Sequence, residues 1–250
     1  MIDLGLDGHV AIVTGATRGL GRSAALALAA EGVKVLGVGR SVESLKSLEA
    51  DGGGSISVAE CDMRDGGQVA ALPALALERF GRLDIVVNNA GIAPAGKFTE
   101  MGEEVWREVF ETNVFAPATL ARAAGPHFIE QRGGKVINIA STSGVLGKPT
   151  LVAYSASKGA VLQFTKALAG EWARFGIQVN AIAPGAYETE AQSAVLEDED
   201  ILARRLRKIP AGRMGRPDEI GPLVCLLASP AGDFMTGSVV VADGGESSTL

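Results

Sequence analysis

A tyrosine and a lysine stand four residues apart in the stretch YSASK, as Tyr154 and Lys158. On a helix this spacing places both side chains on one face. A phenol has a reference pKa of about 10, and a neighbouring ammonium favours the phenolate and lowers that pKa by about 1–3 units. The sequence therefore predicts a pair that gives a proton to a carbonyl oxygen, or takes one from an alcohol.

Two more polar residues are expected close to this pair. Ser141 stands directly after the apolar stretch KVINIA, where its hydroxyl would hold a substrate oxygen, and Ser143 is an alternative donor. Asn113 is a polar residue in the otherwise apolar face of VWREVFETNVF, where it would hold a water that links Lys158 to solvent. The alternative is a plain helix surface carrying Tyr154 and Lys158, with a loop serine nearby.

Three glycines separate the apolar stretch VAIVT from an alanine-rich one in TGATRGLG, at Gly15, Gly19 and Gly21. They stand where a chain leaving a strand must turn and enter a helix, and the free N–H groups at a helix start favour a phosphate. The spacing differs from the commoner Gly-x-Gly-x-x-Gly fingerprint. A structural turn without a ligand is the alternative interpretation.

Two further strand ends indicate a nucleotide. Asp62 follows the third expected strand, where a carboxylate would accept from an adenine amino group, or alternatively would cap a turn or helix. The stretch NNAG, with Asn89, Ala90 and Gly91, follows the fourth strand. Its small and amide side chains would let the backbone approach a ribose while they fasten neighbouring loops.

The end of the second expected strand, VGVGRS, bears on the choice of cofactor. A carboxylate there would hold the ribose hydroxyls of NAD and repel a 2′-phosphate, and none is present. Gly39 leaves space, and Arg40 and Arg18 would supply permanently charged donors to that phosphate. We therefore expect NADP(H) to be preferred, with NAD(H) as the alternative, unless both arginines are ordinary surface charges.

Composition limits the classes of function. The chain has 250 residues and a net charge of −6, which disfavours a broad nucleic-acid or anionic-membrane surface. Cys61 and Cys225 are too few for a disulfide framework, the start MIDLGLDGHV is unlike a signal peptide, and no apolar run reaches the ~20 residues of a membrane helix. We expect a cytoplasmic protein. His9 and His127 lack a companion cysteine cluster, so no metal site is expected.

Short apolar stretches alternate with helix-like segments along the whole chain. Because most of them are apolar throughout, both faces of the sheet should be covered by helices, as in a parallel sheet. We expect one α/β domain over residues 1–250, a Rossmann-type doubly wound fold with ligands beyond the carboxyl ends of the strands. The seven strands of this mostly parallel sheet are expected at Val10–Thr14, Val33–Gly39, Ser55–Ala59, Asp84–Asn88, Lys135–Ala140, Ile177–Ala183 and Ser238–Asp243.

One segment lies outside this alternation. Residues Thr189 to Pro210 are highly charged and follow the loop APGAY. They are either a solvated helix pair or a mobile lid over a substrate. We expect a small substrate-lid insertion at about residues 186–212. Gly176 is expected to end the helix that precedes the sixth strand.

Taken together, the motifs resemble the short-chain dehydrogenase/reductase family over essentially the whole chain. They are TGATRGLG, CDM, NNAG, Asn113, Ser141, YSASK, NAIAPG and the terminal DGG, in the order and approximate spacing of the family. The resemblance implies that Asn113, Ser141, Tyr154 and Lys158 form a catalytic tetrad. It also implies cofactor binding by Gly15, Thr17, Arg18, Gly19, Leu20, Gly21, Arg40, Asp62, Met63, Asn89, Ala90, Gly91, Tyr154, Lys158, Pro184, Gly185, Tyr187 and Thr189.

The resemblance further implies an NADP(H)-dependent oxidoreductase that interconverts a secondary alcohol and a ketone by hydride transfer. The framework stretches are most similar to sugar-acid and polyol members of the family, and also to 3-oxoacyl-carrier-protein reductases. A sugar acid or polyol substrate is expected, with a 3-oxoacyl thioester as the alternative. A catalytically silent nucleotide-binding protein is the alternative from another class. Family members usually form tetramers, so we expect a homotetramer built on the helices around Glu104 to Ala124 and Tyr154 to Phe175.

Overall fold

The computed structural model describes residues 3–248 and contains a seven-stranded sheet of order β3-β2-β1-β4-β5-β6-β7. Every neighbouring pair of strands is parallel, so the sheet is wholly parallel rather than mostly so. All seven expected strands are present with ends within one residue of the prediction. They are β1 (Val10–Thr14), β2 (Lys34–Gly39), β3 (Ile56–Glu60), β4 (Ile85–Asn88), β5 (Gly134–Ile139), β6 (Ile177–Pro184) and β7 (Val239–Ala242).

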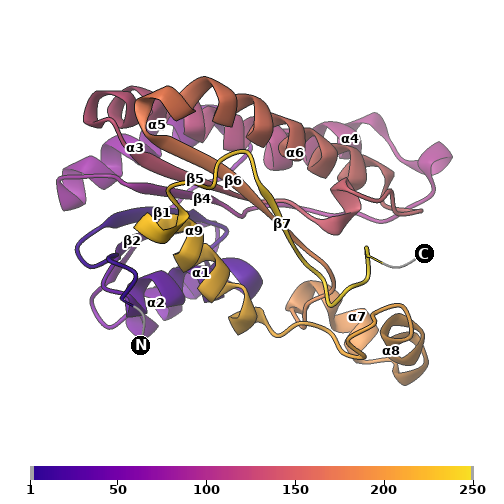
Figure 1. Cartoon of the computed structure of the whole chain (residues 1–250). Helices are drawn as coiled ribbons and strands as arrows, with labels where there is room; N and C mark the ends of the chain where they lie inside the picture. Colours follow the sequence, from indigo (N-terminus) through magenta and orange to yellow (C-terminus); the bar gives the residue numbers. More distant parts are fainter. Residues whose placement is uncertain (1–2, 249–250) are drawn as a thin grey trace.

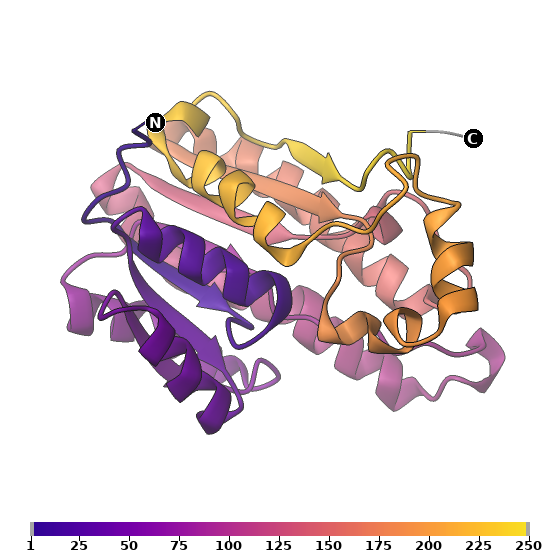
Figure 2. The same cartoon turned by 90° about the horizontal axis from the view of Figure 1, so that it is seen from below.

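Helices cover both faces of this sheet, as expected for a doubly wound fold (Figure 1). On one face α1 packs against α9, with α2 beside them, and these helices stand in front of the strands in Figure 2. On the other face α3 packs against α5, and α6 lies over β6. The helices are α1 (Gly19–Ala30), α2 (Val42–Asp51), α3 (Gly66–Phe80), α4 (Glu103–Phe110), α5 (Ala116–Gln131), α6 (Val152–Trp172), α7 (Ser193–Leu196), α8 (Glu199–Leu206) and α9 (Gly221–Ala228).

The two faces of the sheet carry two separate hydrophobic cores. In β1, Ala11 and Val13 point into the core under α1 and α9, whereas Val10 and Ile12 point into the core that holds Phe128 of α5. Successive strand residues point to opposite faces, so each strand must be apolar throughout. This is the physical reason for the continuous apolar stretches in the sequence.

The parallel arrangement brings the loops after all strands to one edge of the sheet. The neighbours β1 and β4 lie at the point where the strand order reverses, which is where such sheets bind ligands. At the opposite edge Gly176 ends the helical segment before β6, as expected, with a left-handed φ of +75°. A Cβ at this position would lie 2.7 Å from the carbonyl oxygen of Arg132, so the turn requires glycine.

The charged segment after β6 forms the two short helices α7 and α8, which lie at the end of the molecule near the C-terminal segment (Figures 1 and 2). Asp198 begins α8 by accepting the N–H of Ile201 at 2.9 Å. Leu202 and Leu206 pack on a small cluster apart from the two main cores, formed by Ala186, Ile209 and Met214. Within residues 3–248, no helix combines the length and the apolar character that crossing a bilayer requires.

Candidate active site

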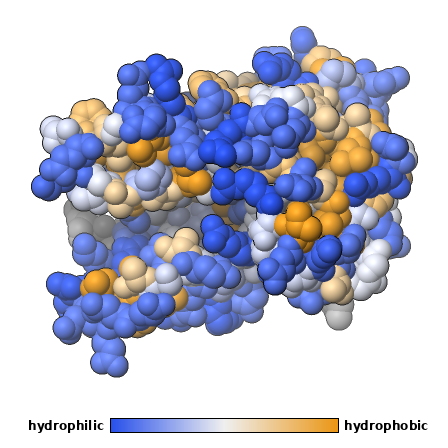
Figure 3. Space-filling view, turned by 180° about the vertical axis from the view of Figure 1, so that it is seen from behind, coloured by the Kyte–Doolittle hydropathy of each residue, from blue (hydrophilic) through white to orange (hydrophobic). Residues whose placement is uncertain are grey.

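A cavity of about 1410 Å³ lies at the carboxyl edge of the sheet. Its walls come from the loops after β1 to β6, from α8, and from Glu246, which follows β7. A hollow opens in the surface on the left of Figure 3, the side where α7 and α8 lie. The volume exceeds the 300–1,000 Å³ typical of a pocket for one small ligand, so the cavity has room for two.

Nearly all the predicted site residues line this cavity. The exceptions are Asn113 and Gly21, which lie behind its wall. The predicted residues that do line it are Gly15, Thr17, Arg18, Gly19, Leu20, Arg40, Asp62, Met63, Asn89, Ala90, Gly91, Ser141, Tyr154, Lys158, Pro184, Gly185, Tyr187 and Thr189.

The glycine turn after β1 is closed from behind by the loop after β4. Asn89 Nδ2 donates to the carbonyl oxygens of Thr14 at 3.0 Å and Gly15 at 3.1 Å. A Cβ at Gly21 would overlap both the Gly15 carbonyl oxygen and Asn89 Nδ2. Gly21 therefore permits close packing of α1 on the turn and does not itself face the cavity.

Thr14 completes this junction, a role that the sequence did not indicate. Its Oγ1 accepts the N–H of Asn89 at 3.0 Å and of Ala90 at 3.1 Å. The backbone of the NNAG stretch is thus fixed to the end of β1. The hydroxyl-bearing residue at a strand end was the available signal, but its partners lie more than 70 residues away in sequence.

Arg18 and Arg40 reach the cavity without a protein partner. Within the described residues, neither side chain forms an ion pair or a hydrogen bond, although both line the cavity. The expectation that Gly39 leaves space for a ligand is wrong. A Cβ at Gly39 would lie 2.6 Å from Cγ2 of Thr17. Gly39 makes room for Thr17 and not directly for a ligand.

Asp62 is already engaged by its own neighbour. Its carboxylate accepts from Arg64 Nη2 at 2.6 Å and Nε at 3.0 Å, and these hydrogen bonds lower its pKa to about 2. Its backbone N–H donates to Gln68 Oε1 at 3.0 Å. The carboxylate remains at the cavity wall, but it also organises the turn before α3, which agrees with the alternative interpretation of this residue.

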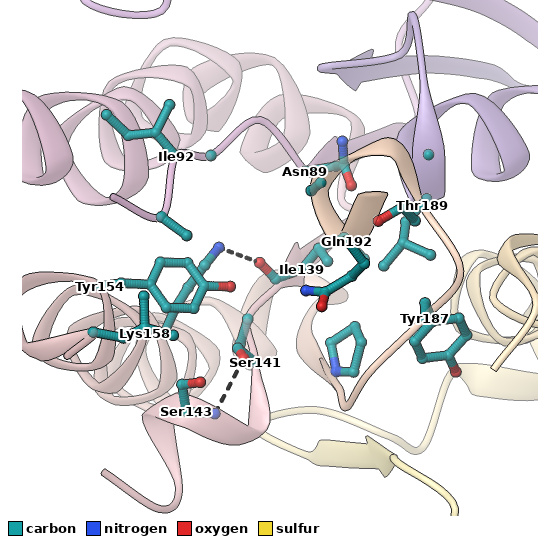
Figure 4. Close-up of a pocket in the computed structure, with 18 of the residues that line it drawn as sticks. Asn89, Ile92, Ile139, Ser141, Ser143, Tyr154, Lys158, Tyr187, Thr189 and Gln192 are labelled. Carbon is teal, nitrogen blue, oxygen red and sulfur yellow. Dashed lines mark hydrogen bonds between the residues drawn. The ribbon is translucent and has the colours of Figure 1, made fainter. Parts of the chain in front are cut away.

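Tyr154, Lys158 and Ser141 converge on the cavity (Figure 4). Tyr154 and Lys158 share one face of α6, as their spacing predicts, with Lys158 Nζ 5.7 Å from the centre of the Tyr154 ring. Nζ donates to the carbonyl oxygen of Ile139 at 2.7 Å, and this lysine is only 4% exposed. Ser141 Oγ accepts the N–H of Ser143 at 3.0 Å. The three groups that proton transfer requires are thus in one place.

The expected direction of the Tyr154 pKa is wrong for this structure. Burial raises the pKa of the Tyr154 phenol, and the side chain of Ser141 opposes this shift. Burial also lowers the pKa of Lys158 to about 8, because the ammonium is removed from water. The lysine is directed to Ile139, and burial is the largest cause of the shift in the pKa of the phenol.

Asn113 forms a set of hydrogen bonds that the sequence did not predict. It lies in a π-helical turn, Glu111–Phe115, between α4 and α5. Its Oδ1 accepts the N–H of Ile92 at 2.9 Å, and its Nδ2 donates to the carbonyl oxygen of Ile92 at 2.9 Å and to Ser157 Oγ at 3.0 Å. The amide nitrogen thus uses both of its N–H groups, whereas Oδ1 keeps a second lone pair, so the expected water stays a prediction. These bonds tie the loop after β4 to α6.

Ser157 is a positioning residue that the sequence analysis missed. It is fully buried and its hydroxyl donates to the backbone oxygen of Tyr154 at 2.7 Å. It lies in YSASK, one position from Lys158, but only the fold shows that it joins Asn113 to the first turn of α6. A contact between residues 44 positions apart has no local signature.

The loop after β6 lies opposite Tyr154 across the cavity (Figure 4). Thr189 and Gln192 approach the cavity, and Gln192 was not predicted. The ring of Tyr187 is 8% exposed and packs where Gly215 leaves room, and its hydroxyl is directed away from Tyr154. Ala186, beside it, belongs to the small cluster under α8.

Charged side chains form a second group on the cavity wall that the sequence analysis did not assign. Arg205 of α8 forms a bidentate pair with Glu246, with Nη2 at 2.6 Å from Oε2. Lys148 and Lys208 also line the cavity. The basic run RRLRK is visible in the sequence. Its proximity to Lys148 and to Glu246 arises only in the folded chain.

The histidines lie outside the cavity, and both cysteines are buried, although Cys61 reaches the cavity wall. His9 Nδ1 and His127 Nε2 each lie 3.1 Å from a backbone carbonyl oxygen, of Leu6 and Leu83 respectively. No group of three His, Cys, Asp or Glu residues that could hold a metal occurs within residues 3–248. Cys61 and Cys225 are buried in different cores, and burial raises the pKa of each thiol to about 11.

Comparisons with known proteins agree with this geometry. A family model described as Enoyl-(Acyl carrier protein) reductase matches residues 15–247. The 2-dehydro-3-deoxy-D-gluconate 5-dehydrogenase of Escherichia coli (strain K12) is 39% identical, and the match covers 96% of each chain. A 3-oxoacyl-(acyl-carrier-protein) reductase of Thermotoga maritima is 36% identical, with 96% of this chain and 98% of that protein covered.

Solved structures extend the likeness to three dimensions. A gluconate 5-dehydrogenase from Burkholderia cenocepacia J2315, in complex with NADP and tartrate, superposes with a TM-score of 0.94. It is 35% identical, and the match covers 99% of this chain and 98% of that one. The chain belongs to the short-chain dehydrogenase/reductase family, a family of oxidoreductases, as the sequence motifs predicted.

Proposed function

We propose that this protein is an NADP(H)-dependent oxidoreductase that interconverts a ketone and a secondary alcohol, with Tyr154 as the proton donor and acceptor. The observation that carries this proposal is the convergence of Tyr154, Ser141 and Lys158 on a cavity that also holds Arg18 and Arg40. A binding protein would need no phenol held beside a lysine. The catalytically silent alternative is therefore disfavoured by the site itself.

The residues present fit a phosphorylated dinucleotide. The glycine turn opens on the cavity at the start of α1, where backbone N–H groups favour a phosphate. Arg18 and Arg40 form no ion pair with any described carboxylate, so they would hold a 2′-phosphate. A Cβ at Gly91 would lie 3.2 Å from Asn113 Oδ1, so this glycine lets the loop after β4 lie close to Asn113. The NADP bound to the Burkholderia relative supports the same cofactor.

Tyr154 would act on the oxygen of the substrate. When bound, the reduced nicotinamide supplies a hydride to the carbonyl carbon and leaves oxidised. Because burial raises the pKa of the phenol, Tyr154 is protonated at neutral pH and ready to give that proton to the oxygen. Ser141 would donate to the same oxygen and position it. Lys158 would hold the nicotinamide ribose, close to the tyrosine ring.

The substrate that we favour is a sugar acid or polyol. The relatives from Escherichia coli and Burkholderia are named for sugar acids, and the latter was solved with tartrate, a hydroxy dicarboxylate. A 3-oxoacyl thioester is the second candidate, because the Thermotoga relative is named as a reductase of that substrate. Lys148 and Lys208 on the cavity wall favour the first.

Three further features belong to the same proposal. Residues 186–212 would form a lid, since α8 lies on the cavity and rests on a small separate cluster. The chain would form one domain and assemble as a homotetramer. Phe115, which lies between α4 and α5 and is 53% exposed, would offer an apolar contact to a second copy. Sedimentation of a Phe115→Glu variant tests the assembly. A cytoplasmic location fits two buried, unpaired cysteines.

The decisive experiment measures NADPH oxidation across a panel of ketones, with the wild type and Tyr154→Phe. We expect the variant to bind NADPH as the wild type does and to lose turnover by about a hundredfold or more, since general acid catalysis contributes 10²–10⁴. Fluorescence titration of NADPH and thermal unfolding serve as controls for folding. Turnover that survives the substitution would remove Tyr154 from its role, and binding without turnover on the whole panel would favour the silent alternative.

A further inference from the structure

The cavity is basic at both ends, and the strand order separates the two. Arg18 and Arg40 follow β1 and β2. Lys148 follows β5, at the other side of the sheet, and α8 and Glu246 follow β6 and β7. Ser141 also follows β5, and Tyr154 and Lys158 lie on α6, which connects β5 to β6. The second basic end is therefore on the same side of the sheet as the candidate catalytic residues, and away from the arginines proposed for the cofactor.

Of the cations at this second end, Arg205 is neutralised. The Glu246 carboxylate accepts hydrogen bonds from both Nη atoms of Arg205. The side chains of Arg205 and Glu246 are only 18% and 13% exposed. Such a bidentate pair fixes α8 against the segment after β7 and leaves no net charge. Neither member has a free role in binding an anion.

Lys148 has no such partner. It is half-buried and lines the cavity, and within residues 3–248 its Nζ forms neither an ion pair nor a hydrogen bond. Asp243, the other nearby carboxylate, accepts the N–H groups of Gly245 at 2.9 Å and Ser247 at 2.7 Å and so serves its own turn. Burial lowers the pKa of Lys148, with Glu246 acting against that shift and Arg205 acting with it. A partly buried ammonium of this kind is stabilised by an anion.

The backbone holds Lys148 in place relative to Tyr154. Its N–H donates to Ser155 Oγ at 3.2 Å, and Ser155 is the next residue after Tyr154 on α6. Its carbonyl oxygen accepts the N–H of Leu151 at 3.2 Å. Thr150, in the same turn, has a left-handed φ of +65° and accepts the N–H of Gly96 at 2.9 Å. The loop is thus tied both to the tyrosine helix and to the loop after β4.

We propose that Lys148 binds the carboxylate of the substrate, and hence that the protein acts on a hydroxy or keto acid in preference to a neutral polyol or an acyl thioester. This inference rests on the proposed function, since it places the acid end of the substrate beside the group that Tyr154 would protonate. A single ammonium fits a carboxylate, which is bound by one point charge and a few hydroxyl contacts. Lys208 lines the cavity and adds positive potential at the same end.

The test uses two probes that differ only at the acid. D-gluconate and D-glucitol have the same chain of hydroxyls, with a carboxylate in the first where the second has a CH₂OH. NADP⁺ reduction is measured for each with the wild type, Lys148→Met, Lys148→Arg, and Lys46→Met as a matched control on the exposed face of α2. Calorimetric titration of D-gluconate into the enzyme with NADP⁺ gives a readout that needs no turnover.

We expect Lys148→Met to lower kcat/KM for D-gluconate by about tenfold to a hundredfold, mainly through KM, as for the loss of a charge-assisted hydrogen bond. The value for D-glucitol should change less than about twofold, Lys148→Arg should recover most of the loss, and Lys46→Met should match the wild type. An equal loss for both probes, or none for D-gluconate, overturns the inference and leaves the proposed function standing. Failure of the wild type to bind D-gluconate also overturns it.

The converse outcome separates the two proposals. If D-gluconate binds in a manner that depends on Lys148, and no substrate is turned over, the carboxylate site stands and the proposed oxidoreductase function falls.

Discussion

Asn113 offers the sharpest test of how the site is held together. Its side chain is 1% exposed and joins the backbone N–H and carbonyl of Ile92 to the hydroxyl of Ser157. Asn113→Ala removes three hydrogen bonds and leaves their partners unpaired. Because Ile92 is half-buried, water recovers part of this cost, and we expect a loss of about 2–4 kcal/mol in the free energy of unfolding. For a chain of 250 residues this corresponds to a fall in Tm of roughly 4–16 °C.

Asn180 supplies the matched control. It is also 1% exposed, and its amide bridges the Met235 carbonyl at 2.6 Å and the Ser238 N–H at 3.0 Å, away from the cavity. Asn180→Ala should lose a comparable free energy of unfolding. Only Asn113→Ala should also lower kcat, by about tenfold or more, because the loop after β4 is then no longer tied to Ser157 on the helix that carries Tyr154.

Urea unfolding and NADPH oxidation, run at one protein concentration, measure both effects. An Asn113→Ala variant within about 1 kcal/mol of the wild type would show that its hydrogen bonds contribute little. Equal losses of kcat in the two variants would show that the effect on activity follows from stability alone, and would refute the positioning role.

Three other predictions concern charge. Burial lowers the pKa of Lys158 from 10.5 to about 8, so the unfolded chain binds more protons between these values and stability rises with pH there. The free energy of unfolding of the wild type minus that of Lys158→Met should rise by about 1 kcal/mol per pH unit above pH 8, and a flat difference would contradict the burial of the charge. Arg40→Asp should weaken NADPH binding relative to NADH by about tenfold or more, and an unchanged ratio of the two Kd values would reject its contact with the 2′-phosphate. Cys61 and Cys225 should resist alkylation at pH 7 in the native protein and react on unfolding, since burial raises the pKa of each thiol to about 11; rapid native labelling would show that a core opens.

The sequence predicts the sheet well because a parallel sheet covered on both faces requires apolar residues at every strand position. The stretch VAIVT at Val10–Thr14 feeds two cores at once, and such stretches are visible without any structure. The pairing of Tyr154 with Lys158 could also be predicted, since the helical repeat places residues four positions apart on one face.

The failures all involve partners far apart in the chain. The bonds of the Asn113 amide to Ile92 and Ser157 were not predicted. The pKa of Tyr154 was expected to fall, and burial raises it. The Arg205–Glu246 pair joins residues 41 positions apart. Burial and long-range pairing are properties of the packed molecule, so local spacing carries no record of them.

The order of strands has a consequence for how such a protein can be altered. The arginines proposed to select the nucleotide follow β1 and β2, whereas Lys148 and α8 follow β5 and β6, and no side chain is shared between the two groups. Changes at one end should therefore combine additively with changes at the other, because distant sites without common partners act independently. The fold thus places the residues proposed to select the nucleotide and those proposed to select the substrate on different loops. Each set can be exchanged without the other, which makes the scaffold suited to stepwise redesign.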